Sequence, residues 1–218
     1  MQIKIDWRII IFVLFFFILK IEYIYILFLI FTIIHEIFHM ITGILVKFEP
    51  TNLSITLFGT QISFKIKIDN YNKKIFKGTI CSLKKIMVYM AGPISNLIIA
   101  SIFYIQRKYD IIIYINLILA IVNLIPIYPL DGGRILKQTL ILLIGRRKAL
   151  KYTNLISNIM LCFVIGVACI FTIFTKIIFI PIGIIYLIYL RIKLHKIYML
   201  KERAYKILEE HSVHYYNM

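Results

Sequence analysis

The sequence predicts an all-α polytopic membrane protein with about six transmembrane helices and a small membrane-associated β-hairpin between the second and third helices. Two observations lead to this fold class. First, 61% of the 218 residues are hydrophobic, a share typical of polytopic membrane proteins and too high for a soluble domain. Second, the apolar residues gather in long runs, and the basic residues fall mostly between alternate runs.

Six apolar runs are candidates for membrane spans, and each is expected to be helical because a helix satisfies its own backbone hydrogen bonds in lipid. The first and last runs are shorter than the others. The first could alternatively belong to a signal peptide, since Lys4 and Arg8 precede its apolar residues, but no small-residue cleavage site follows. The six runs are Trp7–Leu19, Tyr23–Val46, Ile86–Ile105, Ile111–Leu130, Leu155–Thr175 and Ile177–Leu190.

The distribution of Lys and Arg predicts how these spans are oriented. The net charge is +16, and all but four of the 26 basic residues lie on one side of the membrane if the N-terminus is cytoplasmic. This positive-inside pattern predicts that both termini are cytoplasmic, that the basic segments contact anionic lipid, and that no nucleic acid is bound. We expect an integral membrane domain over residues 1–195 and a short cytoplasmic tail over residues 196–218.

The segment between the second and third spans has a different pattern. Apolar and polar residues alternate on both sides of Gly59, which indicates a β-hairpin. An isolated hairpin is marginal in water, so this one is expected to rest on the membrane or on the helices. Its open edge, at Ile62 and Phe64, could bind an extended peptide substrate by strand addition. The alternative is that the hairpin only connects two spans.

The most specific motif is His-Glu-Ile-Phe-His at residues 35–39, inside the second apolar run. A spacing of four places His35 and His39 on one helix face, where two imidazoles can bind one Zn²⁺. Glu36 is then placed to act as general base toward water at the metal. A carboxylate at mid-membrane depth costs about 2.5–3.5 kcal/mol, which argues that it has a function. The alternative is a chance pattern, with both histidines hydrogen-bonded inside a helix bundle.

Two histidines leave a catalytic zinc site incomplete, so a third protein ligand is expected. Asp131 is the best candidate among the few acidic residues in or near the apolar runs. Pro126, Pro129 and the glycines after Asp131 should break the helix, and irregular backbone at membrane depth is tolerated only beside protein or a water-filled cavity. Taken alone, this segment could also be a helix end that exposes Asp131 to water.

Three motifs together carry a family resemblance: HEIFH at 35–39, AGPISN at 91–96 and NLIPIYPLDGG at 123–133. They occur in the order found in the site-2 protease family (M50) of intramembrane zinc metalloproteases, which the chain resembles over its catalytic core, about residues 31–136. The resemblance implies that the chain hydrolyses peptide bonds in or near the membrane with one bound Zn²⁺.

The resemblance also implies roles for individual residues. The implied zinc ligands are His35, His39 and Asp131. The implied catalytic acid/base is Glu36. Asn123 is implied to hold the substrate strand or the developing oxyanion, with Pro129 as a further substrate-binding residue; the alternative for Asn123 is a hydrogen bond between helices. Gly92, Pro93 and Asn96 are expected to serve close packing and helix geometry.

Within the family, the layout looks most like the group of the stage IV sporulation protein FB, which cleaves the precursor of sigma factor K. This implies a membrane-associated sigma-factor precursor as substrate, inhibitory membrane proteins as partners, and a location in the mother-cell membrane around the forespore. Phe38 departs from the Gly of many relatives, and neither a PDZ nor a CBS domain is expected here. The alternatives are another membrane regulator as substrate, such as an anti-sigma factor, an inactive scaffold, or a metal transporter.

Overall fold

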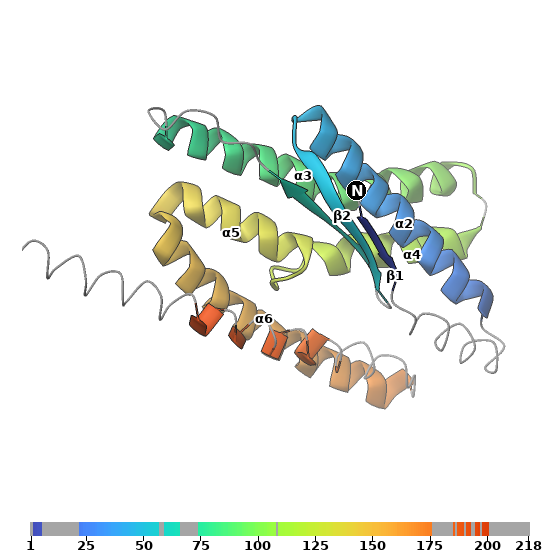
Figure 1. Ribbon diagram of the computed structural model, residues 1–218. Coiled ribbons are helices and arrows are strands. Elements are labelled where there is room, and N and C mark those ends of the chain that lie inside the picture. The colour runs from blue at the N-terminus through green and yellow to red at the C-terminus, as the bar shows by residue number, and fades with distance from the viewer. Residues whose placement is uncertain are drawn as a thin grey trace, which may run out of the picture.

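The computed structural model describes residues 2–5, 22–56, 59–65, 74–107 and 109–175, with isolated residues between 185 and 200. This part of the chain is mostly helical and includes one small sheet (Figure 1). The expected first span lies outside the described residues, and so does most of the expected last one. The helices and strands are α2 (Glu22–Leu45), α3 (Lys74–Ile105), α4 (Asp110–Leu124), α5 (Asp131–Ile144), α6 (Arg146–Thr175), β1 (Gln2–Ile5), β2 (Glu49–Thr56) and β3 (Gly59–Lys65).

Three helices in the described part are long and apolar enough to cross a membrane, over Tyr23–Leu45, Gly78–Ile105 and Arg146–Phe174. Their lengths of 23, 28 and 29 residues exceed the roughly 20 that a hydrocarbon core requires. Large apolar side chains remain exposed along all three, which suits contact with lipid and not with water. The protein is therefore a membrane protein. Helix α4 is also apolar but has only 15 residues.

Helix α4 ends at Leu124, earlier than the expected end of the fourth span at Leu130. Pro126 explains the difference, because a residue before proline is driven out of the helical conformation, and Ile125 has φ −59° and ψ 132°. Residues 125–130 form an irregular loop in which the Tyr128–Pro129 peptide bond is cis. Helix α5 then begins at Asp131, in the stretch between the fourth and fifth expected spans.

The sheet has the strand order β1-β2-β3. Strand β2 pairs antiparallel with β3, with a register irregularity between Pro50 and Asn52, and β1 adds to the other edge of β2 in parallel. β1 was not expected from the sequence. The sheet lies beside α2, which contacts both β2 and β3 (Figure 1). Within the described chain, the outer edge of β3 pairs with no further strand.

Helix α3 is the central element of the bundle, because it packs against α2, α4 and α5 (Figure 1). An apolar cluster of Phe31 from α2 with Ile115 and Leu119 from α4 fills one side of this packing. Polar side chains are buried farther along the same interfaces, among them His35, His39, Asn96 and Asp131. In the membrane such buried polar groups are expensive and point to function.

Candidate metal centre

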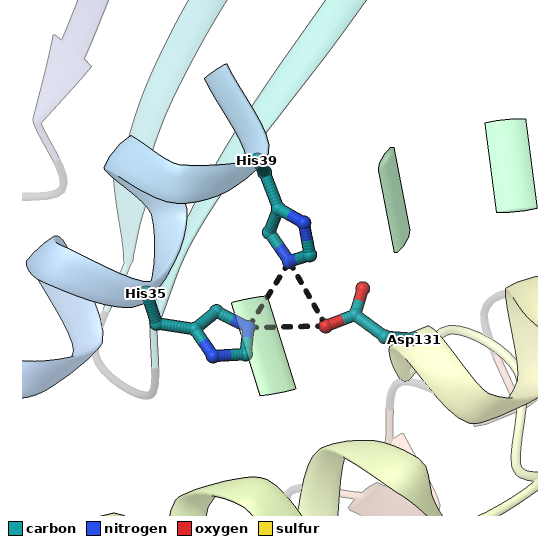
Figure 2. A group of neighbouring side chains, drawn as sticks. All are labelled: His35, His39 and Asp131. Atoms are coloured by element: carbon teal, nitrogen blue, oxygen red, sulfur yellow. Dashed lines mark hydrogen bonds and ion pairs between the residues drawn. The ribbon is translucent and has the colours of Figure 1, made fainter. Parts of the chain in front are cut away.

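His35 and His39 lie one turn apart on α2 and point into the bundle, 2% and 4% exposed respectively. Their rings meet edge to face, and their Nε2 atoms are 3.1 Å apart. Asp131 Oδ2 lies 3.0 Å from His35 Nε2 and 3.1 Å from His39 Nε2, which completes a nearly equilateral triangle (Figure 2). Residues 92 positions apart in the chain thus direct three ligand-type atoms at one point.

The backbone conformation of residues 125–133 places Asp131 beside the two histidines. A Cβ on Gly132 would lie 2.0 Å from the Leu124 carbonyl oxygen, and one on Gly133 would lie 2.3 Å from the Tyr128 nitrogen. Only glycine therefore allows the first turn of α5 to pack onto the preceding loop. Ser157 of α6 holds the loop from the other side: its Oγ accepts a hydrogen bond from the Tyr128 N–H at 3.1 Å.

The proton positions in this cluster can be assigned from its hydrogen-bond partners. His39 Nδ1 lies 2.6 Å from the carbonyl oxygen of Val88, which can only accept, so Nδ1 carries the hydrogen. In a neutral ring Nε2 is then a bare lone pair. That lone pair faces Asp131 Oδ2, whose ionised carboxylate also only accepts. Two acceptors 3.1 Å apart in a buried site are stable only with a proton or a metal ion between them, so this arrangement suits a metal ion.

The carboxyl group of Asp131 is suited to be ionised. The Arg134 guanidinium contributes from 3.7 Å, at Asp131 Oδ1, and also stacks over the Tyr89 ring. The start of α5 adds the favourable end of a helix dipole.

The donor set fits zinc. Ligands held 2.0–2.1 Å from a tetrahedral zinc ion lie roughly 3.3 Å apart, close to the observed separations of 3.0 and 3.1 Å. Space beside the triangle is kept by Gly92 of α3, where a Cβ would lie 2.5 Å from Nε2 of both histidines. Two imidazoles and one carboxylate leave a fourth position free, the arrangement of catalytic zinc sites.

Glu36 follows His35 on α2 and is partly buried. It lies close enough to His39 and Asp131 to interact with their charges, but it does not belong to the converging group of ligand atoms. That separation leaves its carboxylate available for work other than binding a metal.

The other residues expected to bind substrate lie in α4, in the loop before α5 and in β3. Asn123 is partly buried in the last turn of α4, and Pro129 lies in the loop that leads to Asp131. Ile62 and Phe64 lie in β3, where the backbone pairs them with Leu53 and Pro50 of β2.

Two contacts from α3 to the histidines were not predicted from the sequence. One is the Val88 carbonyl, which no side-chain pattern reveals, because any residue supplies a carbonyl. The other is Asn96, whose side-chain amide lies 3.1 Å from His35 Nδ1. The sequence could have indicated this contact, because an amide inside a long apolar helix is costly unless it has a hydrogen-bond partner.

Known families offer an independent comparison. Residues 105–167 match the model of Peptidase family M50. The match covers α4, the loop, Asp131, α5 and most of α6, so it does not include the histidines on α2. It supports a metallopeptidase of the site-2 protease family, whose members are zinc-dependent, and the M50 segment supplies the third member of the possible metal-binding group. A comparison with curated proteins found no match.

Proposed function

We propose that this protein is an intramembrane zinc metalloprotease that hydrolyses a peptide bond of a membrane-associated protein. The proposed zinc ligands are His35, His39 and Asp131. The observation that carries the proposal is the donation of His39 Nδ1–H to the Val88 carbonyl, because in the neutral ring the Nε2 lone pair then faces Asp131 and can bind a metal. The M50 match over the segment that contains Asp131 supports the same conclusion.

Zinc in such a site polarises the scissile carbonyl and makes water more acidic. The residues of the chain supply the rest of the proposed reaction. Glu36 takes a proton from the attacking water and passes it to the leaving nitrogen, which requires it to stay outside the ligand set. The buried position of the triangle among α2, α3 and α5 shields the site from bulk solvent.

The proposed substrate binds in an extended form along β3. A peptide bond in a stable helix cannot be hydrolysed until its carbonyl leaves the helical hydrogen bond, and pairing with a strand edge achieves this. The outer edge of β3, with Ile62 and Phe64, is one of the two edges of the described sheet, and β3 contacts the helix that carries both histidines. In this proposal Asn123 and Pro129 hold the substrate on the side of Asp131.

The finer assignment concerns the substrate and the place of action. We propose a sigma-factor precursor of the sigma-K type, in the mother-cell membrane around the forespore, with both termini of the protease in the cytoplasm. Inhibitory membrane proteins are the expected partners. Another membrane regulator, such as an anti-sigma factor, is the alternative substrate within the same activity.

The test is co-expression of a sigma-K-type precursor with the wild-type protein or the Glu36→Gln variant in a heterologous bacterium, followed by immunoblotting. The proposal expects a shortened precursor with the wild type alone. Bound zinc in both purified proteins, measured by mass spectrometry, separates a catalytic defect from a lost metal site. Cleavage by Glu36→Gln at the wild-type rate would refute the mechanism. An uncleaved precursor in both lanes, with zinc bound to both proteins, would redirect the search to other membrane regulators.

A further inference from the structure

Asn96 has a side-chain environment that packing does not explain. It is fully buried in α3, and one end of its amide lies 3.1 Å from His35 Nδ1. The opposite atom, Oδ1, is buried and has no hydrogen-bond partner within the described part of the chain. An apolar residue of similar volume would avoid this unsatisfied group, so the amide is expected to serve the histidine.

The position of His35 determines which hydrogen bond Asn96 must make with it. His35 Nε2 faces Asp131 Oδ2 at 3.0 Å and His39 Nε2 at 3.1 Å, so it can bind a metal only when it carries no hydrogen. The ring hydrogen of the neutral imidazole must then be on Nδ1, where it requires an acceptor. The two ends of an amide have nearly the same shape, and with the carbonyl end turned toward the ring, Asn96 supplies that acceptor.

We propose that Asn96 is a positioning residue that holds His35 with its hydrogen on Nδ1 and so directs the Nε2 lone pair at the metal. The inference rests on the proposed function, because it assumes that the triangle binds zinc. With this role for Asn96, α3 supports both histidine ligands: the Val88 carbonyl holds His39, and the Asn96 amide holds His35. Val88, Gly92 and Asn96 recur every four residues and therefore lie along one face of α3.

The chain contains a matched control for this idea. Asn116 of α4 is also fully buried, and its Oδ1 is likewise unpaired within the described residues. Its Nδ2, however, donates to the Ile112 carbonyl of its own helix at 2.9 Å. Replacing Asn116 by Leu therefore removes a buried amide of the same burial without touching either histidine.

The experiment measures zinc affinity of the full-length protein in detergent, by competition with a chromophoric chelator, for the wild type, Asn96→Leu, Asn96→Asp and Asn116→Leu. Loss of an outer partner of a metal-binding histidine weakens metal affinity by about 10- to 100-fold, and this is expected for Asn96→Leu. Asn96→Asp keeps an acceptor for Nδ1–H and should bind zinc nearly as tightly as the wild type. Asn116→Leu should bind like the wild type.

The absorption spectrum of the cobalt-substituted protein adds a readout that general destabilisation does not move. Bands of four-coordinate cobalt are expected to change for Asn96→Leu and to persist for Asn96→Asp and Asn116→Leu. If Asn96→Leu fails to accumulate as folded protein, Asn96→Ala is measured in its place with the same expectation.

The possible outcomes separate this inference from the proposed function. A wild-type protein that binds no zinc would refute the proposed function. Wild-type affinity in Asn96→Leu or its Ala substitute, or an equal loss in Asn116→Leu, would refute the role of Asn96 and leave the zinc site intact. A loss in Asn96→Asp as large as in Asn96→Leu would also overturn it, because an acceptor would then not be what the histidine requires.

Discussion

The substitution Gly92→Ala should strongly weaken metal binding while leaving the fold intact. A Cβ at this position would lie 2.5 Å from Nε2 of both His35 and His39, closer than the 3.0 Å below which real Cβ contacts are essentially never found. Both rings must therefore retreat from α3 by about 0.5 Å or more. Side-chain ends can often move by this much. Here, however, Val88 and Asn96 of the same helix contact the Nδ1 atoms of the two rings and restrict their movement.

The displacement can be converted into expected magnitudes. Ligand distances in metal sites tolerate changes of about 0.2 Å, less than half of the required shift, so zinc affinity should fall by about 100-fold or more. The fold has opposing contributions of similar size. Alanine stabilises a helix by about 1 kcal/mol relative to glycine, whereas the two weakened hydrogen bonds contribute roughly 0.5–1.5 kcal/mol each. The thermal stability of the metal-free protein should therefore change little.

The assay is zinc affinity by chelator competition, together with thermal unfolding of the metal-free protein in detergent. Gly78→Ala is the matched control, because it makes the same change on the same helix at a position where a Cβ would meet nothing within 4 Å. It should keep wild-type zinc affinity. Wild-type zinc affinity in Gly92→Ala would refute the argument that this glycine keeps the space for the metal.

Three further predictions concern the metal and the loop before α5. Removing zinc with a chelator should abolish cleavage of the substrate by the purified protein, and added zinc should restore it; cleavage that persists without metal would contradict the mechanism. Gly133→Ala would place a Cβ 2.3 Å from the Tyr128 backbone nitrogen, so it should lower the free energy of unfolding by about 3 kcal/mol and reduce bound zinc, whereas Gly166→Ala, which meets nothing within 4 Å, should do neither. Ser157→Ala leaves the Tyr128 N–H unpaired and should cost about 1–3 kcal/mol in thermal unfolding. Ser101→Ala removes only a bond within its own exposed helix turn and should cost much less; equal losses would contradict the role given to Ser157.

The ligand set is the part of the site that the sequence predicted most directly. A period of four on an apolar helix identifies two histidines that share a face, and the scarcity of acidic residues in apolar runs leaves few candidates for a third ligand. The structure brings His35, His39 and Asp131 together within 4.8 Å. That they bind zinc stays a prediction until metal is measured.

The remaining fold could be predicted less well, because its determinants are not periodic. β1 has only four residues, and its place beside β2 depends on a pairing between segments 50 residues apart, such as Gln2 with Asn52. The basic stretches that form α5 and the start of α3 lie between the expected spans, and no helix was predicted there. Lysine and arginine are nonetheless good helix formers, and their charge says which side of a membrane they occupy, not whether they are helical.

The support of the histidines from α3 shows a different limit. A carbonyl such as that of Val88 is present at every residue, so only the packing of α3 on α2 can select one of them as an acceptor. Gly92 and Asn96 fit close packing equally well when viewed as sequence, and their relation to His35 follows only from the register between the two helices. A metal centre of this kind therefore has two sets of determinants. The ligands can be found by their chemistry, whereas the groups that orient them are found only when the helices are placed side by side.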